Sequence, residues 1–130
     1  MAFYLTQSLH RVLQLRSKHP ATVFGERRQT WAEVGDRVAR LAGALQGLGL
    51  RAGERVGMMA LNSDRYLEYY FGSWWAGCVV NPVNVRWSAA EVAYSLDDCD
   101  TTVLIVDDHF VPMVAELRAR SRSLRTVIHV

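Results

Sequence analysis

Lysine, proline and cysteine are scarce in this 130-residue sequence, which has three prolines, two cysteines and Lys18 as its only lysine. Two cysteines cannot form a disulfide framework, and Cys78 and Cys99 lack the CxxC spacing of zinc and redox sites. We therefore expect two reduced thiols in a cytoplasmic protein. The formal net charge of +2 is too small to indicate a partner made of nucleic acid.

Long apolar runs are also missing. No run approaches the roughly 20 residues of a membrane-spanning helix, so no transmembrane segment is predicted. Residues 1–20 lack the basic start, continuous apolar middle and cleavage site of a secretory signal. An amphipathic transit peptide would look somewhat similar, but Leu9, Val12 and Leu13 among arginines favour a first helix over residues 6–18. The 50% apolar content is that of a folded domain.

The clearest helix in the sequence follows Thr30 and Glu33, which have the spacing of a capping box. Behind them, apolar residues recur at alternating steps of three and four: Trp31, Val34, Val38, Leu41, Leu45 and Leu48. This pattern predicts an amphipathic helix that packs on a sheet, ended by a left-handed residue at Gly47 or Gly49. A coiled coil is the alternative, disfavoured by the short stripe. A hairpin over residues 21–31 is expected before this helix.

The next helix is expected to begin near residue 63 and to be covered on most sides. Its predicted apolar face consists of Leu67, Tyr70, Phe71, Trp74, Trp75 and Cys78. Gly72 and Gly77 would allow close backbone approach. Residues 109–120 are predicted to form a further helix.

Residues 74–107 contain a strand at Val79-Val80, a polar loop, a helix capped by Ser88 and Glu91, and a β-branched strand at 103–106. Strand, helix and strand within some thirty residues form a βαβ unit, which implies a parallel sheet. Further strands are expected at residues 55–61 and 125–130. The predicted fold class is α/β, with a mostly parallel sheet and helices on both faces.

The run A-G-C-V-V-N-P-V-N-V-R-W-S-A-A-E-V-A-Y-S-L-D-D-C-D-T-T-V-L-I-V-D, residues 76–107, resembles the N-terminal region of adenylate-forming, AMP-binding acyl-CoA ligases. The resemblance extends from about residue 20 to residue 130 and rests on the order of segments rather than on one short motif. It implies that residues 1–130 are the first, partial subdomain of a ligase large domain. The parent would activate a carboxylic acid, in particular a fatty acid, with ATP and Mg²⁺ and transfer it to CoA.

Catalysis in the resembling family depends on a Ser/Thr/Gly-rich phosphate loop followed by lysine, a later ribose-binding acid and a lysine of a small C-terminal domain. None of these lies in this sequence, which also has no GxGxxG or Walker loop. The resemblance therefore implies no catalytic residue here, an inactive chain, and no tight binding of ATP, CoA or Mg²⁺ by the chain alone.

The best candidate for ligand binding is the loop that contains Asn84, Arg86 and Trp87. Loops after parallel strands are where α/β proteins bind ligands, and in some resembling ligases this loop lies near the CoA nucleotide. Arg86 could pair with a phosphate while Trp87 stacks on a base. The alternative is that Arg86 pairs with a neighbouring acid and Trp87 packs in the core.

Two further clusters have both a functional and a structural interpretation. The segment 62–64 could hold an anion at a helix N-terminus, or it could simply cap that helix. Asp107, Asp108 and His109 could form a metal or acid–base cluster, but adjacent strand residues point to opposite faces. We therefore expect Asp108 to cap the following helix and predict no metal site.

A function of another class remains open, in which the chain is a stand-alone α/β binding or interaction module without catalysis. If residues 1–130 are instead a fragment of a ligase, the predicted strand 125–130 has an edge that the remaining residues of the ligase would have covered. Exposed edges of this kind recruit other chains, so a homo-oligomer is expected.

Overall fold

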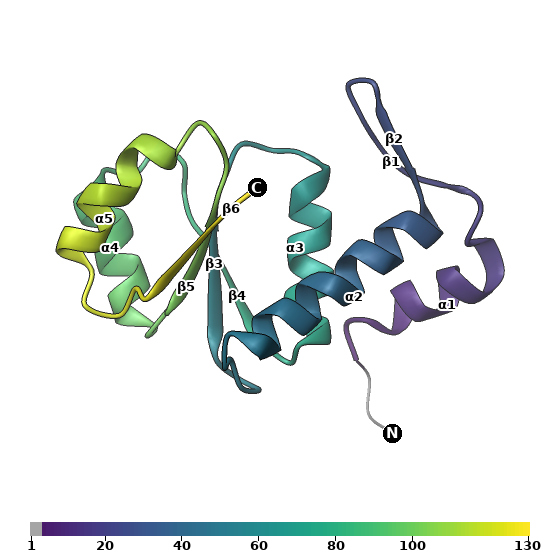
Figure 1. The fold of residues 1–130 in the computed structure, drawn as a ribbon, viewed down its shortest axis with the longest axis horizontal. Coiled ribbons are helices and arrows are strands. Elements are labelled where there is room, and N and C mark those ends of the chain that lie inside the picture. Colours follow the sequence, from purple (N-terminus) through teal and green to yellow (C-terminus); the bar gives the residue numbers. More distant parts are fainter. Residues whose placement is uncertain (1–3) are drawn as a thin grey trace. The chain divides into compact units, whose positions relative to one another are not determined.

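The computed structural model describes residues 4–130 (Figure 1). The prediction that residues 1–20 are not a secretory signal includes residues 1–3, which lie outside the described part. The chain divides into two compact units. The helical unit contains the residues up to Arg51 together with Asn62–Gly77, and the sheet unit contains Ala52–Leu61 and Cys78–Val130.

The helical unit consists of three helices and a hairpin. Its elements are α1 (Gln7–Arg16), β1 (Pro20–Phe24), β2 (Arg27–Thr30), α2 (Trp31–Gly47) and α3 (Asp64–Trp75). β1 and β2 pair antiparallel, which confirms the predicted hairpin. The Thr30 side chain accepts from the N–H of Glu33, and the Glu33 carboxylate accepts from the N–H of Thr30, so the capping box is present. Thr6 precedes α1 without a capping hydrogen bond from its side chain.

Helices α2 and α3 pack closely within this unit. Val34, Val38 and Leu45 are fully buried, as the helical stripe predicts, whereas Leu48, also predicted in the stripe, follows the last residue of α2 and is 48% exposed. A Cβ added to Gly72 would lie 2.6 Å from Cδ2 of Leu41, so only glycine permits this approach. Gly49 has a φ of +88° and supplies the left-handed residue after α2.

The buried face of α3 differs from the predicted one. Asp64, Glu68 and Ser73 are buried, whereas Trp75 is 36% exposed. The two carboxylates are tolerated because Arg27 of the hairpin and arginines of α2 and α3 pair with them. Leu67 and Phe71 are half-buried against a cluster formed by α1 and α2. Periodicity alone missed charged residues whose partners lie far away in the sequence.

The sheet unit contains four parallel strands in the order β4-β3-β5-β6. The strands are β3 (Arg55–Met59), β4 (Val79–Pro82), β5 (Val103–Val106) and β6 (Thr126–His129). The parallel α/β fold is thus confirmed, but β4 and β5 are not neighbours, because β3 lies between them. β4 is an edge strand, which accommodates Pro82.

Two helices pack on the sheet within this unit (Figure 1). They are α4 (Ala89–Asp98) and α5 (Val114–Arg120), and their buried side chains join strand residues in one core. The predicted helix over residues 109–120 is shorter, because a 3₁₀ turn at Val111–Met113 with a proline in it precedes α5. Residues 109 and 110 lie before this turn.

Candidate functional site

The segments that follow β3, β4 and β5 all leave the sheet at one edge, since the three strands are parallel neighbours. They are Leu61, the loop 83–88 and the turn 107–110. In α/β sheets this carboxyl edge is where ligands bind. The predicted residues Asn84, Arg86 and Trp87 therefore lie where a site is expected.

The loop 83–88 is held at both ends. Val83 is buried and donates its N–H to the carbonyl of Met58 at 2.9 Å. At the other end, the N–H of Ser88 donates to Glu91 Oε2 at 2.8 Å, and the Ser88 hydroxyl accepts from the Glu91 N–H at 3.4 Å. The predicted capping box is confirmed, and the hydrogen bonds from the backbone and hydroxyl of Ser88 lower the pKa of Glu91.

Asn84 shapes the middle of this loop. Its side-chain Oδ1 accepts from the N–H of Arg86 at 2.9 Å, and its carbonyl accepts from the N–H of Trp87 at 3.1 Å. Such a side-chain bond two residues ahead is an Asx turn. Asn84 therefore organises the backbone that carries the other two side chains.

Arg86 and Trp87 both reach solvent. Trp87 is 37% exposed and does not pack as a core residue. No carboxylate among residues 4–130 forms an ion pair with Arg86, which is also exposed. Arg86, which has no ion-pair partner among residues 4–130, and Trp87 with its accessible indole ring are consecutive residues of the loop that follows β4.

A groove of about 520 Å³ runs from this loop along the outer face of α4. Its lining consists of Trp87, Ala90, Glu91, Tyr94, Ser95 and Asp98. Tyr94 was not recognised from the sequence, although it is 71% exposed. The signal was available, because Tyr94 stands beside the apolar stripe of Val92, Ala93 and Leu96 in the predicted helix.

Asp107 and Asp108 form hydrogen bonds with segments near the carboxyl edge of the sheet. Asp107 Oδ2 accepts from the N–H of Leu61 at 2.8 Å, and its Oδ1 accepts from the N–H of Phe110 at 3.3 Å. Asp108 Oδ1 lies 2.7 Å from Nε2 of His129. The prediction that Asp108 caps the next helix is wrong, because Asp107 closes that turn. Within the described part of the chain, no three His, Cys, Asp or Glu side chains could hold a metal ion together.

The segment 62–64 acts as a helix cap. Ser63 Oγ accepts from the N–H of Arg65 at 3.2 Å. The Asp64 carboxylate occupies the first turn of α3 and pairs with Arg27. The capping interpretation is confirmed, and the negative charge that a helix N-terminus favours comes from the chain itself.

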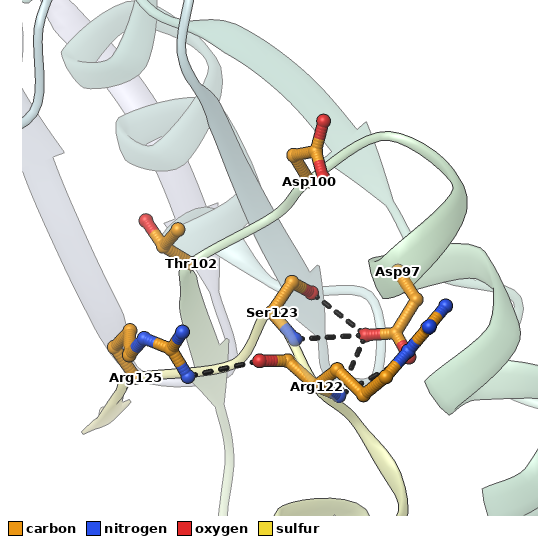
Figure 2. A pocket seen from close by; sticks show the side chains of 6 residues that line it. All are labelled: Asp97, Asp100, Thr102, Arg122, Ser123 and Arg125. Carbon is orange, nitrogen blue, oxygen red and sulfur yellow. Dashed lines mark hydrogen bonds and ion pairs between the residues drawn. The ribbon is translucent and has the colours of Figure 1, made fainter.

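A second polar pocket, of about 410 Å³, lies at the amino ends of β5 and β6 (Figure 2). Asp97 Oδ1 accepts from the hydroxyls of Ser121 at 2.6 Å and Ser123 at 2.9 Å, and its carboxylate also accepts from backbone N–H groups of Arg122 and Ser123. Burial acts to raise the pKa of Asp97, but these hydrogen bonds outweigh it and hold the pKa well below its usual range. The carboxylate is occupied by its own turn and serves structure.

Comparison with known proteins identifies the chain's relatives. The AMP-binding enzyme family matches residues 9–130. A long-chain-fatty-acid–CoA ligase of Thermus thermophilus is 39% identical over 102 residues, which cover 78% of this chain and 18% of that protein. A 2-succinylbenzoate–CoA ligase of Arabidopsis thaliana is 35% identical over 81% of this chain and 19% of its own length. The chain thus spans about a fifth of the curated relatives it matches.

Solved structures agree with these relatives. An anthranilate CoA ligase in complex with anthranoyl-AMP superposes with a TM-score of 0.93 at 29% identity, over 98% of this chain and 25% of that one. A Mycobacterium tuberculosis fatty acyl CoA synthetase gives a TM-score of 0.87 at 26% identity. The superposition covers 94% of this chain and 25% of that one. Among residues 4–130, no helix has the length and apolar character to cross a membrane.

Proposed function

Because the chain belongs to the AMP-binding enzyme family, we propose that it forms the first part of the large domain of a carboxylic acid–CoA ligase. The parent enzyme would use ATP and Mg²⁺ to form an acyl-adenylate and then transfer the acyl group to CoA. Within that reaction, residues 1–130 would supply the sheet edge on which CoA docks. The acid would be a fatty or other apolar one, a preference supported by the name of the Thermus relative.

The observation that carries this proposal is the pair of accessible side chains on the anchored loop 83–88. Arg86 has no ion-pair partner among residues 4–130, and Trp87 presents a third of its surface. A guanidinium recognises a phosphate through paired N–H donors, and an indole stacks on a purine. We propose that Arg86 binds a phosphate of the CoA nucleotide, that Trp87 contacts its base, and that Asn84 positions both.

The proposal is tested in a chimera, in which residues 9–130 replace the matching segment of the Thermus ligase. We expect acyl-CoA synthesis to persist. Arg86→Ala should raise the KM for CoA roughly ten- to hundredfold, because a charge-assisted contact is worth about 1.5–3 kcal/mol. ATP–pyrophosphate exchange should stay near the unsubstituted chimera, since adenylation precedes CoA binding.

The matched control is Arg11→Ala, which removes an exposed arginine from α1. Arg11→Ala should change neither ATP–pyrophosphate exchange nor the KM for CoA. Equal losses of exchange and thioester formation in Arg86→Ala would show that Arg86 acts structurally and would refute its role in CoA binding.

Self-association through β6 is a further part of the proposal. Among the strands of residues 4–130, β6 pairs only with β5, so its outer edge presents backbone groups without a strand partner. Such an edge can add a strand from a second copy. A cytoplasmic location is also proposed, supported by the two free cysteines, one of them buried.

A further inference from the structure

Residues 4–30, which contain α1 and the β1–β2 hairpin, differ in charge from the rest of the chain. They include five basic residues and a single acid, Glu26, and therefore carry a formal charge of +4. The rest of the chain carries −2, so the net charge of +2 conceals this asymmetry. All five basic residues are exposed: Arg11, Arg16, Lys18, Arg27 and Arg28. A basic segment of this kind is attracted to a polyanionic surface.

Most of this positive charge is not neutralised by other side chains. Arg27 pairs with Asp64. The other four basic residues form no ion pair with a carboxylate among residues 4–130. Arg16 Nη1 lies 3.2 Å from the ring nitrogen Nε2 of His19, which leaves its charge in place. This part of the helical unit therefore presents four cations to solvent.

Large apolar side chains are exposed among these cations. They are Tyr4, Leu5, Leu15, Val23 and Phe24, each between 46% and 71% exposed. Val23 lies directly opposite Arg28 in the hairpin, and directly opposed residues share a face of a sheet. The hairpin projects from the helices of its unit (Figure 1), so this face is accessible. The surface is thus apolar and basic at the same time.

An anionic lipid bilayer matches both properties. Its headgroups attract basic residues, and its interface takes up exposed apolar side chains, so that the two contributions add. A nucleic acid would use the cations but would leave the aliphatic Leu5, Leu15 and Val23 without a role. A second copy of this surface would bring a further formal charge of +4 against the first and would be repelled. The bilayer is therefore the partner that these residues favour.

We propose that α1 and the β1–β2 hairpin form a docking surface for an anionic membrane. Val23 and Phe24 enter the boundary between headgroups and acyl chains, while Lys18 and Arg28 contact the headgroup phosphates. The use of this contact rests on the proposed function, because a fatty or other apolar acid dissolves in a bilayer and a docked ligase meets it there. The cytoplasmic leaflet supplies the anionic lipids that the surface requires.

The test is flotation of the 130-residue chain with vesicles made of equal parts of phosphatidylcholine and phosphatidylglycerol. Flotation separates bound chain from aggregates, which sink. We expect the chain to float with these vesicles and to remain unbound with vesicles of phosphatidylcholine alone. Binding should weaken as the salt concentration rises, because salt screens the attraction between exposed charges.

The first pair of variants tests the charges. Lys18→Ala/Arg28→Ala should weaken binding roughly twentyfold, because each basic residue near an anionic surface contributes about fivefold. Arg118→Ala/Arg122→Ala is the matched control, since it removes two exposed arginines of the sheet unit and changes the net charge equally. It should leave binding within about twofold of wild type. Glu26→Gln should instead strengthen binding about fivefold, which tests the surface in the opposite direction.

The second pair tests the apolar side chains. Leu15→Ser/Val23→Ser should weaken binding roughly tenfold or more, because two aliphatic groups no longer leave water. Tyr94→Ser is the matched control, since Tyr94 is 71% exposed but lies in the sheet unit. It should bind like wild type.

Several results would overturn the inference. Equal binding to neutral and anionic vesicles would refute the role of the cations, and equal losses in the two double-alanine variants would refute the surface. A chain that leaves vesicles unbound but binds poly(U) through Lys18 and Arg28 would have a nucleic acid as its partner. None of these assays contains ATP, CoA or an acid substrate. A failure of membrane docking is therefore distinguished from a failure of the chimera to make acyl-CoA.

Discussion

Arg27 and Asp64, which are 37 positions apart in the sequence, form a two-pronged ion pair within the helical unit. Arg27 Nε lies 2.6 Å from Asp64 Oδ2, and Arg27 Nη2 lies 2.5 Å from Oδ1. The side chain of Asp64 is 1% exposed and that of Arg27 is 42% exposed. The pair ties the β1–β2 hairpin to the first turn of α3, and the Arg27 hydrogen bond lowers the pKa of Asp64.

The first prediction concerns the stability that this pair contributes. Arg27→Ala would leave a buried carboxylate without its partner, and we expect the free energy of unfolding to fall by about 1.5–3 kcal/mol. Urea unfolding measures this change. Arg28→Ala is the matched control, because Arg28 is the neighbouring exposed residue of the same strand, and it should change stability by no more than about 0.5 kcal/mol. Equal effects of the two substitutions would contradict a special role for the pair.

The second prediction concerns acid stability. The pKa values of Asp64 and Asp97 are lower in the folded chain than their ordinary value of 3.8. The unfolded chain therefore binds protons more readily, so the stability these groups contribute is present above about pH 4 and is lost as the pH falls below it. Thermal unfolding followed from about pH 6 to about pH 2 should show this loss.

Asp97→Asn should make the chain less stable by about 1.5–3 kcal/mol at neutral pH, because charge-assisted hydrogen bonds to Ser121 and Ser123 are weakened. The difference from the wild-type chain should shrink as the pH falls from about 4 toward about 2, because the Asp97 carboxyl of the unfolded wild-type chain takes up a proton there while that of the folded chain does not. Asp98→Asn, one residue further and exposed, is the control and should run parallel to wild type. A constant deficit of Asp97→Asn at every pH would contradict the protonation argument.

The third prediction concerns the outer edge of β6. Thr126 and Val130 donate their N–H groups toward β5, to the carbonyls of Thr102 and Val106. Because strand N–H groups alternate, Val127 and His129 direct theirs to the free edge. We expect light scattering across a dilution series to show self-association that His129→Pro abolishes, since proline removes one outward donor.

His129→Ala is the control for this edge. It removes the contact with Asp108 but keeps the outward N–H, so it should associate like wild type. A wild-type chain that is monomeric at every concentration would refute association through β6.

The fourth prediction is that the 130-residue chain does not adenylate carboxylic acids. The sequence has no Ser/Thr/Gly-rich loop followed by lysine, the feature that supplies phosphate contacts in the resembling ligases. ATP–pyrophosphate exchange with a panel of fatty acids should remain at the level of a blank without protein. The Thermus ligase chimera that carries residues 9–130 serves as the positive control, and exchange by the chain alone would show that phosphate binding lies within residues 1–130.

The sequence by itself determined the local structure of this protein. Both capping boxes, at Thr30 and at Ser88, and the buried stripe of α2 followed from residues three or four positions apart. The parallel α/β class and the loop of Asn84, Arg86 and Trp87 were also predictable, because a strand, a loop and a helix succeed one another directly. These features depend on residues that are close together in the sequence, and a periodic sequence pattern reflects interactions between such residues.

Only the tertiary structure decided which distant residues meet. It inserted β3 between β4 and β5, buried Asp64 and Glu68 against arginines from other elements, and gave Asp107 rather than Asp108 the turn that precedes α5. It also left Tyr94 exposed along one groove with Trp87. Strand order and ion pairing depend on contacts between residues tens of positions apart, and the free energy of those contacts exists only once the elements have packed.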